Sequence, residues 1–434
     1  MTQIEHAKIV LPTSPAALHL QPCDVLVLDA GLRQSLVTVR SLGSRGLRVA
    51  ALEIAHKVPA FSSRWCQQQI ICPAEEGTEQ YLEYVEQVLD ATKARVLITS
   101  SDGTVALLRQ HRERLEQRVR VALASEPGMG IAVNKDQTLE IAQKLGLAIP
   151  RGISLSSVNE VDAALREIGL PAVIKPVESW VENTEGQERA RILAQLATTP
   201  DEARRAVEEL TALGGSVLFQ KFLTGRREGV HLLYANGQVY GRFAQWAKRT
   251  DPPLGGSSVL RQSIAIPEDI GEPSERLIRE INLEGYSEVE FRRDGDGTPY
   301  LMEINPRLSA SIEMAVRSGV DFPYLIYQWA SGEPINEVKS YHVGGWMRYL
   351  GGDIATTAAA IEQRGRPGVA PPLRTVLDFC ASFFVPMGYD YFNWRDPKPA
   401  WVASAGFTQL LLKWMGRNIA KPFRKKQTAS TLVK

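Results

Sequence analysis

The chain has 434 residues, which is long enough for two or three domains of ordinary size and for a substantial buried core. Lys and Arg total 50 and Asp and Glu total 49, so the formal net charge of +1 gives no electrostatic reason to expect nucleic acid as a partner. Hydrophobic residues make up 44% and charged residues 23%, a balance that is typical of a folded globular protein and excludes a disordered or fibrous one.

The first predicted elements alternate between strand and helix. A short apolar strand at residues 24–29 is followed by a glycine turn, a helix to residue 42 and a second strand at residues 47–53. A helix near residues 80–91 then precedes another buried strand at residues 95–99. Residues 100–103 (Ser-Ser-Asp-Gly) follow the carboxyl end of this strand, where parallel sheets bind ligands. The alternative for these residues is the N-cap of a helix that starts near Thr104.

The same strand, turn, helix and strand, with Glu53 at the end of the second strand, also outline a dinucleotide-binding unit. That motif needs three spaced glycines so that the backbone can approach the pyrophosphate, and only Gly31 is present. The sequence therefore argues against NAD binding.

A second unit is predicted to begin near Asn134. Asn134 opens a helix that runs through residue 145, where Gly146 and Pro150 are the expected terminators. Residues 171–176 are typical of a strand and carry one lysine, Lys175. The glutamate-rich residues 177–189 have no clear apolar period and are predicted to form a loop.

Three further strands and a helix continue this unit. The helix is expected at residues 201–213 and the strands at residues 216–222, 230–234 and 239–246. Asn236 and Gly237 lie between the last two strands and favour a tight hairpin turn.

The most informative stretch predicts a second hairpin at residues 287–305. Residues 287–292 alternate polar and apolar, residues 294–297 (Asp-Gly-Asp-Gly) are typical of a turn, and residues 300–305 resume a strand. If the turn is symmetric, one face is buried. That buried face carries Val289, Phe291, Met302 and Ile304. The opposite face carries Glu288, Glu290, Glu303 and Asn305.

This carboxylate face needs a partner, because like charges that face each other across a hairpin destabilise it by ~0.2–1 kcal/mol. Carboxylate and amide oxygens suit Mg²⁺ or Mn²⁺, and Mg²⁺ often takes few protein ligands while phosphates and waters complete its octahedron. The alternative is the solvated outer face of an ordinary hairpin. An EF-hand is excluded, because Asn305 stands where the last loop position requires glutamate.

With these pieces in order, the chain resembles the ATP-grasp superfamily, and within it the carboxylate-amine ligases similar to the halves of carbamoyl phosphate synthetase. The resemblance covers residues 134–334 and is most specific at residues 303–307 (Glu-Ile-Asn-Pro-Arg) and 318–323 (Ser-Gly-Val-Asp-Phe-Pro). It implies an α/β and α+β architecture, with a Rossmann-like parallel-sheet domain before the ATP-grasp fold. The implied domains are residues 1–125, residues 126–336 with two lobes of about 126–214 and 215–336, and a C-terminal extension at residues 337–434.

The resemblance also implies the site. Glu290, Glu303 and Asn305 would bind the metal ion. Lys135 and Lys175 would hold the ATP phosphates as compact ammonium charges, and Lys175 and Arg307 would act at the transferred phosphoryl group. Glu228 would accept hydrogen bonds from the ribose hydroxyls. The backbone of a hinge would meet the adenine edge, and this hinge consists of Gln220, Lys221, Phe222 and Leu223.

The resemblance implies a role for each of two loops, and for both loops an alternative stays open. Residues 177–189 lie where family members carry a glycine-rich flap, but their glutamates would repel a triphosphate. Either Arg189 and Arg191 compensate, or this loop is not the phosphate lid. The second loop would face the acceptor carboxylate through Arg249, Arg261 and Ser257, and its alternative is a solvated loop. His231 is expected to be packed or on the surface, and not catalytic.

The implied activity is that of an ATP- and Mg²⁺-dependent (or Mn²⁺-dependent) ligase that phosphorylates a carboxylate to an acyl phosphate and joins it to an amine or a similar nucleophile. Its partners would be small-molecule carboxylates and amines, and no nucleic acid. A kinase-like enzyme of the same fold and a non-catalytic ATP-binding regulatory protein are the alternatives. The retained Glu290, Glu303, Asn305 and Arg307 argue against the regulatory protein.

The cysteines and the two ends of the chain bear on its location. The four cysteines form no CxxC pair and have no nearby histidine at zinc-ligand spacing, so we expect small buried side chains in a reduced cytoplasmic setting. No export signal is visible at the N-terminus, and no apolar run reaches the ~18–20 residues of a membrane-spanning helix.

Past Asp396 the chain has no acidic residue and becomes basic and amphipathic. This tail would either lie on an anionic membrane surface, at the periphery of the inner membrane, or form a core-facing terminal helix.

Overall fold

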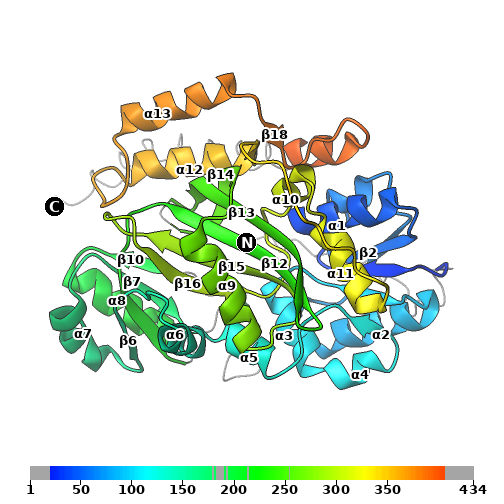
Figure 1. Ribbon diagram of the computed structural model, residues 1–434, viewed down its shortest axis with the longest axis horizontal. Helices are drawn as coiled ribbons and strands as arrows, with labels where there is room; N and C mark the ends of the chain where they lie inside the picture. The colour runs from blue at the N-terminus through cyan, green and yellow to red at the C-terminus, as the bar shows by residue number, and fades with distance from the viewer. Residues whose placement is uncertain are drawn as a thin grey trace, which may run out of the picture.

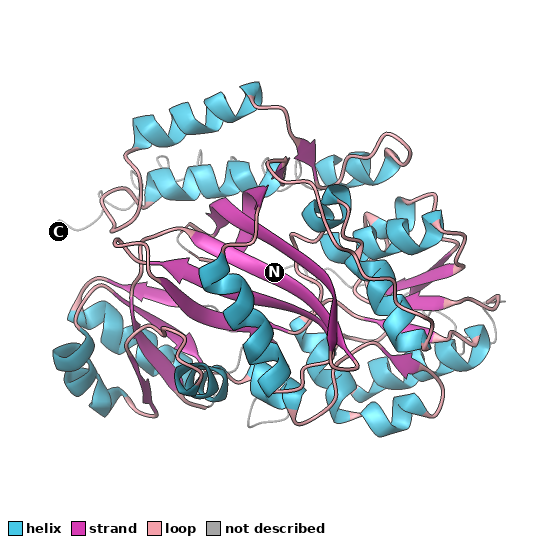
Figure 2. Ribbon diagram, in the orientation of Figure 1, coloured by secondary structure: helices cyan, strands magenta, loops and turns pink. Residues whose placement is uncertain are grey.

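The structure is a computed structural model that describes residues 20–177, 180–181, 190–191, 194–212, 215–253 and 255–405. Its strands form three main sheets, with helices around them (Figures 1 and 2). The basic C-terminal tail, from residue 406 onward, lies outside the described residues, so its predicted membrane or core contact stays a prediction.

The N-terminal sheet is parallel and has five strands in the order β3-β2-β1-β4-β5. The predicted alternation of strand and helix is confirmed, and β3 and β5 are strands that the sequence pattern did not predict. Alternate residues of β1 enter different cores, since Leu26 packs in one apolar cluster and Val25 and Val27 pack in another. The sheet is therefore covered on both faces, as a parallel sheet requires. Its elements are β1 (Val25–Val27), α1 (Arg33–Ser44), β2 (Val49–Glu53), η2 (Ala60–Ser62), β3 (Gln68–Ile71), α2 (Glu79–Thr92), β4 (Val96–Ile98), α3 (Asp102–Gln110), α4 (Arg112–Glu116) and β5 (Arg120–Val121).

The second sheet is antiparallel and has four strands in the order β10-β7-β11-β6. Helices α7 and α8 cover one face through an apolar cluster that includes Ile174 and Phe219. Lys175 follows Ile174 in β7 and so points to the opposite face. The elements of this region are α5 (Gly128–Val133), α6 (Lys135–Lys144), β6 (Gly152–Leu155), η3 (Val158–Glu160), α7 (Val161–Ile168), β7 (Ala172–Pro176), β10 (Gln195–Ala197), α8 (Pro200–Ala212) and β11 (Val217–Lys221).

The predicted glutamate-rich loop at residues 177–189 contains the short strand β8 (Trp180–Val181), which pairs with β9 (Ala190–Arg191) directly after the loop. The loop prediction therefore missed a small hairpin. Residues 182–189 and most of the loop's glutamates lie outside the described residues, so its role at the phosphates stays a prediction.

The third sheet has seven strands in the order β16-β15-β12-β13-β14-β17-β18, all antiparallel except β17 and β18. The predicted turn between β12 and β13 is confirmed, because Asn236 and Gly237 have φ angles of 49° and 78°. The elements are β12 (Arg227–Ala235), β13 (Gln238–Asp251), β14 (Ser257–Ile264), α9 (Glu268–Glu280), β15 (Gly285–Arg293), β16 (Pro299–Asn305), α10 (Glu313–Ser318), α11 (Phe322–Ser331), β17 (Trp346–Arg348), α12 (Leu350–Glu362), α13 (Pro372–Ala381), η4 (Ser382–Phe384) and β18 (Gly388–Tyr389).

The sheets do not follow the domain limits expected from the sequence. Strand β11 pairs with β6 and β7 in the four-stranded sheet, although it begins after the expected lobe limit at residue 214. Strands β17 and β18 continue the seven-stranded sheet past the expected limit at residue 336. The C-terminal extension is thus joined to the large sheet. Helix α12 lies against that sheet, and α13 lies on the far side of α12 (Figure 1).

The cysteines are all free in the structure. Cys23 and Cys72 are buried as expected, and burial raises the pKa of the half-buried Cys66 thiol to about 12. Cys380 is exposed, so the prediction of a buried side chain is wrong there. No helix in the described part of the chain is long and apolar enough to cross a membrane.

Candidate functional site

The hairpin of β15 and β16 carries the predicted carboxylate face. Glu290 lies directly opposite Glu303, and Glu288 lies opposite Asn305, so these four side chains share one face of the sheet. The predicted buried face needs one correction, because the register shifts between Glu290 and Phe291. This irregularity places Leu301, and not Met302, opposite Phe291. Leu301 is fully buried, whereas Met302 is only half-buried.

The carboxylates on this face are poorly compensated. Burial raises the pKa of the Glu290 carboxyl to about 7, Glu303 and Glu288 add to the rise, and the Arg227 guanidinium opposes it. Arg227 makes an ion pair with Glu290. Glu288 lies 3.5 Å from His231 Nε2, and Asn305 Nδ2 donates to Glu288 at 3.5 Å. Several acidic groups therefore share few positive partners.

The two predicted phosphate-binding lysines lie beside this face. Lys135, the first residue of α6, has its Nζ 3.9 Å from Glu303 Oε2, and Lys175 Nζ lies 3.5 Å from the carbonyl oxygen of Met302. Burial lowers the pKa of Lys175 to about 8. Burial alone would raise the pKa of Glu303, but Lys135, Lys175 and Arg227 outweigh it and lower that pKa. Two lysines from different parts of the chain thus converge on one end of β16.

Arg307 lies just past β16 and pairs with Asp102 of α3, in a bidentate contact between residues that are 205 positions apart. Asp102 follows the strand β4, where the sequence offered either a ligand edge or a helix N-cap. The structure has both features at this place. Ser101 Oγ accepts a hydrogen bond from the Thr104 amide, and Ser100, Ser101 and Asp102 line a cavity.

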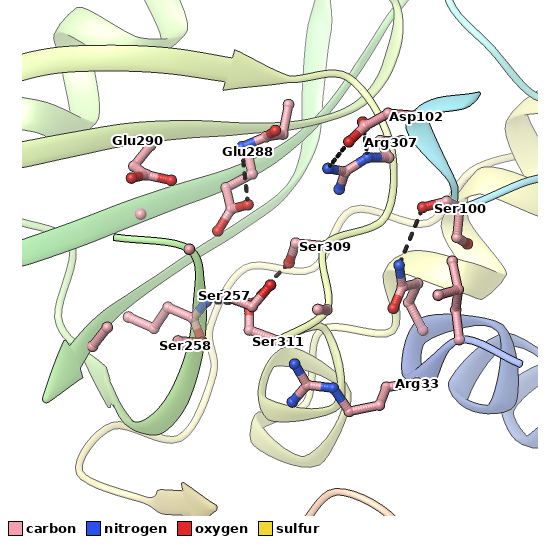
Figure 3. A pocket seen from close by; sticks show the side chains of 18 of the residues that line it. Arg33, Ser100, Asp102, Ser257, Ser258, Glu288, Glu290, Arg307, Ser309 and Ser311 are labelled. Atoms are coloured by element: carbon pink, nitrogen blue, oxygen red, sulfur yellow. Dashed lines mark hydrogen bonds and ion pairs between the residues drawn. The ribbon is translucent and has the colours of Figure 1, made fainter. Parts of the chain in front are cut away.

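This cavity has a volume of about 370 Å³ and lies between the N-terminal sheet and the seven-stranded sheet. Figure 3 shows Glu288, Glu290 and the Asp102–Arg307 pair toward one side and Arg33 toward the other. Of the residues predicted from the sequence, its lining includes Glu228, Ser257, Glu290, Glu303, Asn305 and Arg307. A smaller cavity of about 70 Å³ adjoins it and is lined by Lys135 together with Glu303, Asn305 and Arg307.

The predicted hinge lies at the end of β11, away from these lining residues. The Lys221 amide donates to the Arg151 carbonyl at 2.8 Å, and the Phe222 amide donates to the Pro171 carbonyl at 3.2 Å. The Leu223 carbonyl accepts from Arg292 at 2.7 Å. Gln220 is buried, and its Nε2 has no hydrogen-bond partner among the described residues. Part of the hinge backbone is therefore already engaged within the chain.

Glu228 lines the cavity, and its predicted contact with the ribose stays a prediction. Its carboxylate accepts from Arg226 Nε at 2.8 Å and from Arg293 Nε at 2.9 Å, and the residue is 2% exposed. Two guanidinium groups therefore hold this carboxylate.

The prediction that Arg249 and Arg261 bind the acceptor carboxylate also needs correction. Arg249 donates to both oxygens of Asp353, at 2.5 and 2.8 Å. Arg261 is fully buried and pairs with Asp390. Both guanidinium groups bind carboxylates of the chain itself, so neither faces an acceptor in the cavity. Ser257 does line the cavity. His231 is packed, as expected, with its Nδ1 2.7 Å from the Tyr286 hydroxyl.

The sequence did not nominate several cavity residues. Arg33 and Gln34 belong to the start of α1, and Gln245 lies on β13. Arg227 pairs with the predicted Glu290. These residues come from different segments of the chain, so no local pattern marks them.

The oxygen donors on this face suit a hard divalent cation, but they do not form a complete metal site made of protein ligands alone. No group of three or more His, Cys, Asp or Glu side chains is arranged to hold a metal ion in the part of the chain that the structure describes. Glu290, Glu303 and Asn305 nevertheless offer oxygen donors on adjoining strands. The pKa of Glu290 is raised first by burial and then by the neighbouring carboxylates of Glu303 and Glu288, whose negative charge a cation would balance. Mg²⁺ often binds through one or two carboxylates and substrate phosphates, so this set fits Mg²⁺ bound together with a nucleotide.

Comparisons with known proteins give a consistent result. Residues 216–348 match a family model described as "ATP-grasp in the biosynthetic pathway with Ter operon". The carbamoyl phosphate synthase large chain of Methanoculleus marisnigri is 25% identical over 222 residues, which cover 49% of this chain and 20% of the relative. The D-alanine–D-alanine ligase of Neisseria gonorrhoeae is 28% identical over 196 residues, which cover 40% of this chain and 57% of the relative.

The fold is also similar to that of solved structures. A biotin carboxylase-beta-gamma-ATP complex from Campylobacter jejuni superposes with a TM-score of 0.61 at 14% identity, and the match covers 75% of this chain and 74% of that one. At this identity the likeness establishes the architecture, while the chemistry has to be argued from the residues of this chain.

Proposed function

Because this chain belongs to the ATP-grasp superfamily, as its sequence predicted, we propose that it is an ATP-dependent ligase that activates a carboxylate as an acyl phosphate and joins it to an amine or a similar nucleophile. The observation that carries the proposal is the meeting of opposite charges at one end of β16. Glu290 and Glu303 face each other across the hairpin, and Lys135 and Lys175 lie against the same strand. This arrangement suits a metal-bound polyphosphate, because it offers oxygen donors to a cation and ammonium groups to the phosphates.

In the proposed reaction, a carboxylate oxygen attacks the γ-phosphorus of ATP and the bond from that phosphorus to the β,γ-bridging oxygen breaks. ADP leaves, and an acyl phosphate forms. The amine nitrogen then attacks the acyl carbon, inorganic phosphate leaves, and the nitrogen loses a proton. A free carboxylate would have to expel oxide, so phosphorylation provides the leaving group that the second step needs.

The side chains act by position and charge. Lys135 and Lys175 would bind phosphate oxygens, and Arg307, held by Asp102, would face the charge that develops on the transferred phosphoryl group. A magnesium ion held by Glu290, Glu303 and Asn305 would neutralise phosphate charge. No side chain needs to form a covalent bond with the substrate.

The test measures ADP release from MgATP with a panel of small carboxylates, followed by hydroxylamine to trap an activated acyl group as a hydroxamate. The proposal expects carboxylate-dependent ADP release and a hydroxamate product. A stable phosphorylated product that resists hydroxylamine would favour the kinase-like alternative. MgATP binding without any ADP formation across the panel would favour the regulatory alternative.

Glu303→Ala should lower the rate of ADP release by at least ~100-fold, the size of effect expected when a group that stabilises transition-state charge is removed. The control is Glu272→Ala, which removes an exposed glutamate on α9 and should leave the rate unchanged. If Glu303→Ala releases ADP as fast as this control, the proposed function is wrong.

A further inference from the structure

The cavity has two ends of different chemistry. The end at the hairpin carries acidic side chains and Arg307. The other end, here called the serine end, carries mostly neutral polar groups and one cation, and it consists of Arg33, Ser100, Gln245, Ser258, Ser309 and Ser311. The argument below rests on the proposed function, because it takes the hairpin end as the place of phosphoryl transfer.

Three buried polar atoms of the serine end lack a hydrogen-bond partner among the described residues. They are Ser100 Oγ, Gln245 Oε1 and Ser258 Oγ, on residues that are 1%, 4% and 8% exposed. The Gln245 amide nitrogen donates to Ser311 Oγ, which holds the amide in place, and its Oε1 stays without a partner in a residue that lines the cavity. A buried polar atom without a partner costs about 1–3 kcal/mol, so three of them around one cavity indicate a ligand that supplies the missing hydrogen bonds.

The same end attracts negative charge. Arg33 enters the cavity and pairs with Asp390 at 2.6 Å, and Arg261 binds the same carboxylate. One carboxylate shared by two guanidinium groups leaves a positive charge unbalanced. Arg33 is also the first residue of the 12-residue helix α1, whose N-cap residue Leu32 makes no side-chain capping bond and whose first turn holds no acidic residue. The positive end of this helix therefore adds to the charge of Arg33.

We propose that the serine end binds the distal part of the acceptor acid, and that this acceptor carries a second anionic group, a carboxylate or a phosphate, which Arg33 and the start of α1 recognise. The carboxylate to be activated lies at the hairpin end, near Arg307. The body of the substrate carries hydrogen-bonding groups that pair with Ser100, Gln245 and Ser258. The acceptor is thus a polar dianionic acid, and a simple fatty or aromatic acid would leave the three buried atoms unpartnered.

Binding of matched acid pairs to the full chain tests this assignment. The probes are 2-hydroxyglutarate against 2-hydroxyvalerate and 3-phosphoglycerate against glycerate, all with a hydroxyl group in the body of the acid, titrated by calorimetry in the presence of a non-hydrolysable MgATP analogue. In the native protein, at least one dianion should bind ten-fold more tightly than its monoanionic partner, and the pair that shows this difference tells a carboxylate from a phosphate. Arg33→Gln should abolish the difference. The control Arg45→Gln, near the C-terminal end of α1, should retain it.

The Ser258→Ala variant distinguishes an effect on ligand binding from an effect on protein stability. Because Ser258 Oγ has no partner in the described structure, its removal should leave the Tm of the unliganded protein unchanged or slightly higher, while affinity for the preferred dianion falls several-fold. Binding of the MgATP analogue is measured alone for each protein, so failure of the proposed nucleotide site is seen separately. If the native protein binds this analogue but binds neither dianion at 10 mM, or if Arg33→Gln binds the preferred dianion as tightly as the native protein, the assignment is overturned.

Discussion

At the scale of single residues, the site depends on ionisable groups that burial has moved away from their ordinary pKa values. Burial lowers the pKa of Lys175 to about 8, and it raises the pKa of Glu290 to about 7. Both groups therefore change charge near neutral pH, where an exposed lysine or glutamate would not. Such shifts are common where a ligand of the opposite charge is bound.

Lys175 makes the proposed nucleotide site sensitive to alkaline pH. Its pKa lies near 8, so the ammonium group loses its proton as the pH rises from 7.5 to 9.5, and affinity for metal-free ATP in EDTA should fall several-fold over that interval. Lys175→Arg keeps its charge throughout and should bind ATP with a flatter pH profile. The measurement is the Kd of ATP at each pH, and identical profiles for the two proteins would contradict the role of Lys175.

The same shift has a consequence for stability. The pKa of Lys175 falls from 10.5 in the unfolded chain to about 8 in the folded one, so the buried charge lowers stability at neutral pH and the cost fades as the pH rises toward 10.5. Lys175→Met should therefore raise the free energy of unfolding at pH 7, by up to about 3 kcal/mol, while it weakens ATP binding. Urea unfolding at pH 7 checks this, and a less stable variant would contradict it.

At the scale of elements, the register of the β15–β16 hairpin decides which side chains reach the site. The four polar residues alternate with the core residues, and the shift after Glu290 changes the partner of Phe291 without moving the Glu290–Glu303 pair. A bulge of this kind re-aims one part of a strand and leaves the rest of the ladder in place. The carboxylate face and the core face can therefore follow different registers along one hairpin.

This register predicts unequal costs for two neighbouring residues of β16. Leu301→Ala removes a fully buried side chain and should lower the free energy of unfolding by about 2–5 kcal/mol. Met302→Ala changes a half-buried side chain and should cost about 1 kcal/mol or less. Urea unfolding of both variants is the measurement. A larger loss of unfolding free energy for Met302→Ala than for Leu301→Ala would contradict this register and support the symmetric hairpin expected from the sequence.

At the scale of the whole molecule, buried ion pairs join the C-terminal extension to the rest of the chain. Asp396 is 1% exposed and accepts from Arg40 Nε at 2.9 Å, Ser63 Oγ at 2.7 Å and the Arg64 amide at 2.9 Å. Asp390 pairs with Arg33 of α1 and with Arg261 of β14. The extension thus connects the N-terminal sheet with the large sheet beside the cavity, and it helps to place Arg33.

Loss of Asp396 should loosen this connection. Asp396→Ala leaves Arg40 buried without its carboxylate and should lower the free energy of unfolding by about 3–5 kcal/mol. Hydrogen exchange of residues 388–405 should become faster than in the control Asp201→Ala, which removes an exposed carboxylate of α8. Equal exchange in the two variants would show that the extension is held by other contacts.

The sequence by itself determined the elements and the local chemistry of this protein. The alternation of residues 287–292 and the turn after them predicted that Glu290 and Glu303 share a face, because side-chain direction along a strand follows from the period of the backbone alone. Local pattern likewise predicted the N-terminal strands β1, β2 and β4 and the turn at Asn236 and Gly237. Residues 303–307 and 318–323, together with the strand and turn before them, carried the resemblance to the ATP-grasp superfamily.

Only the tertiary structure decided which charges are paired and which face the cavity. Arg249, Arg261 and Arg307 look alike in sequence, but the first two are paired with Asp353 and Asp390 of the extension, while the third pairs with Asp102 at one side of the cavity. Charge pairing depends on distance in space, and these partners are separated by 104, 129 and 205 positions along the chain. For the same reason Arg33, at the start of a helix in the first sheet, becomes a cavity residue only when the chain is folded.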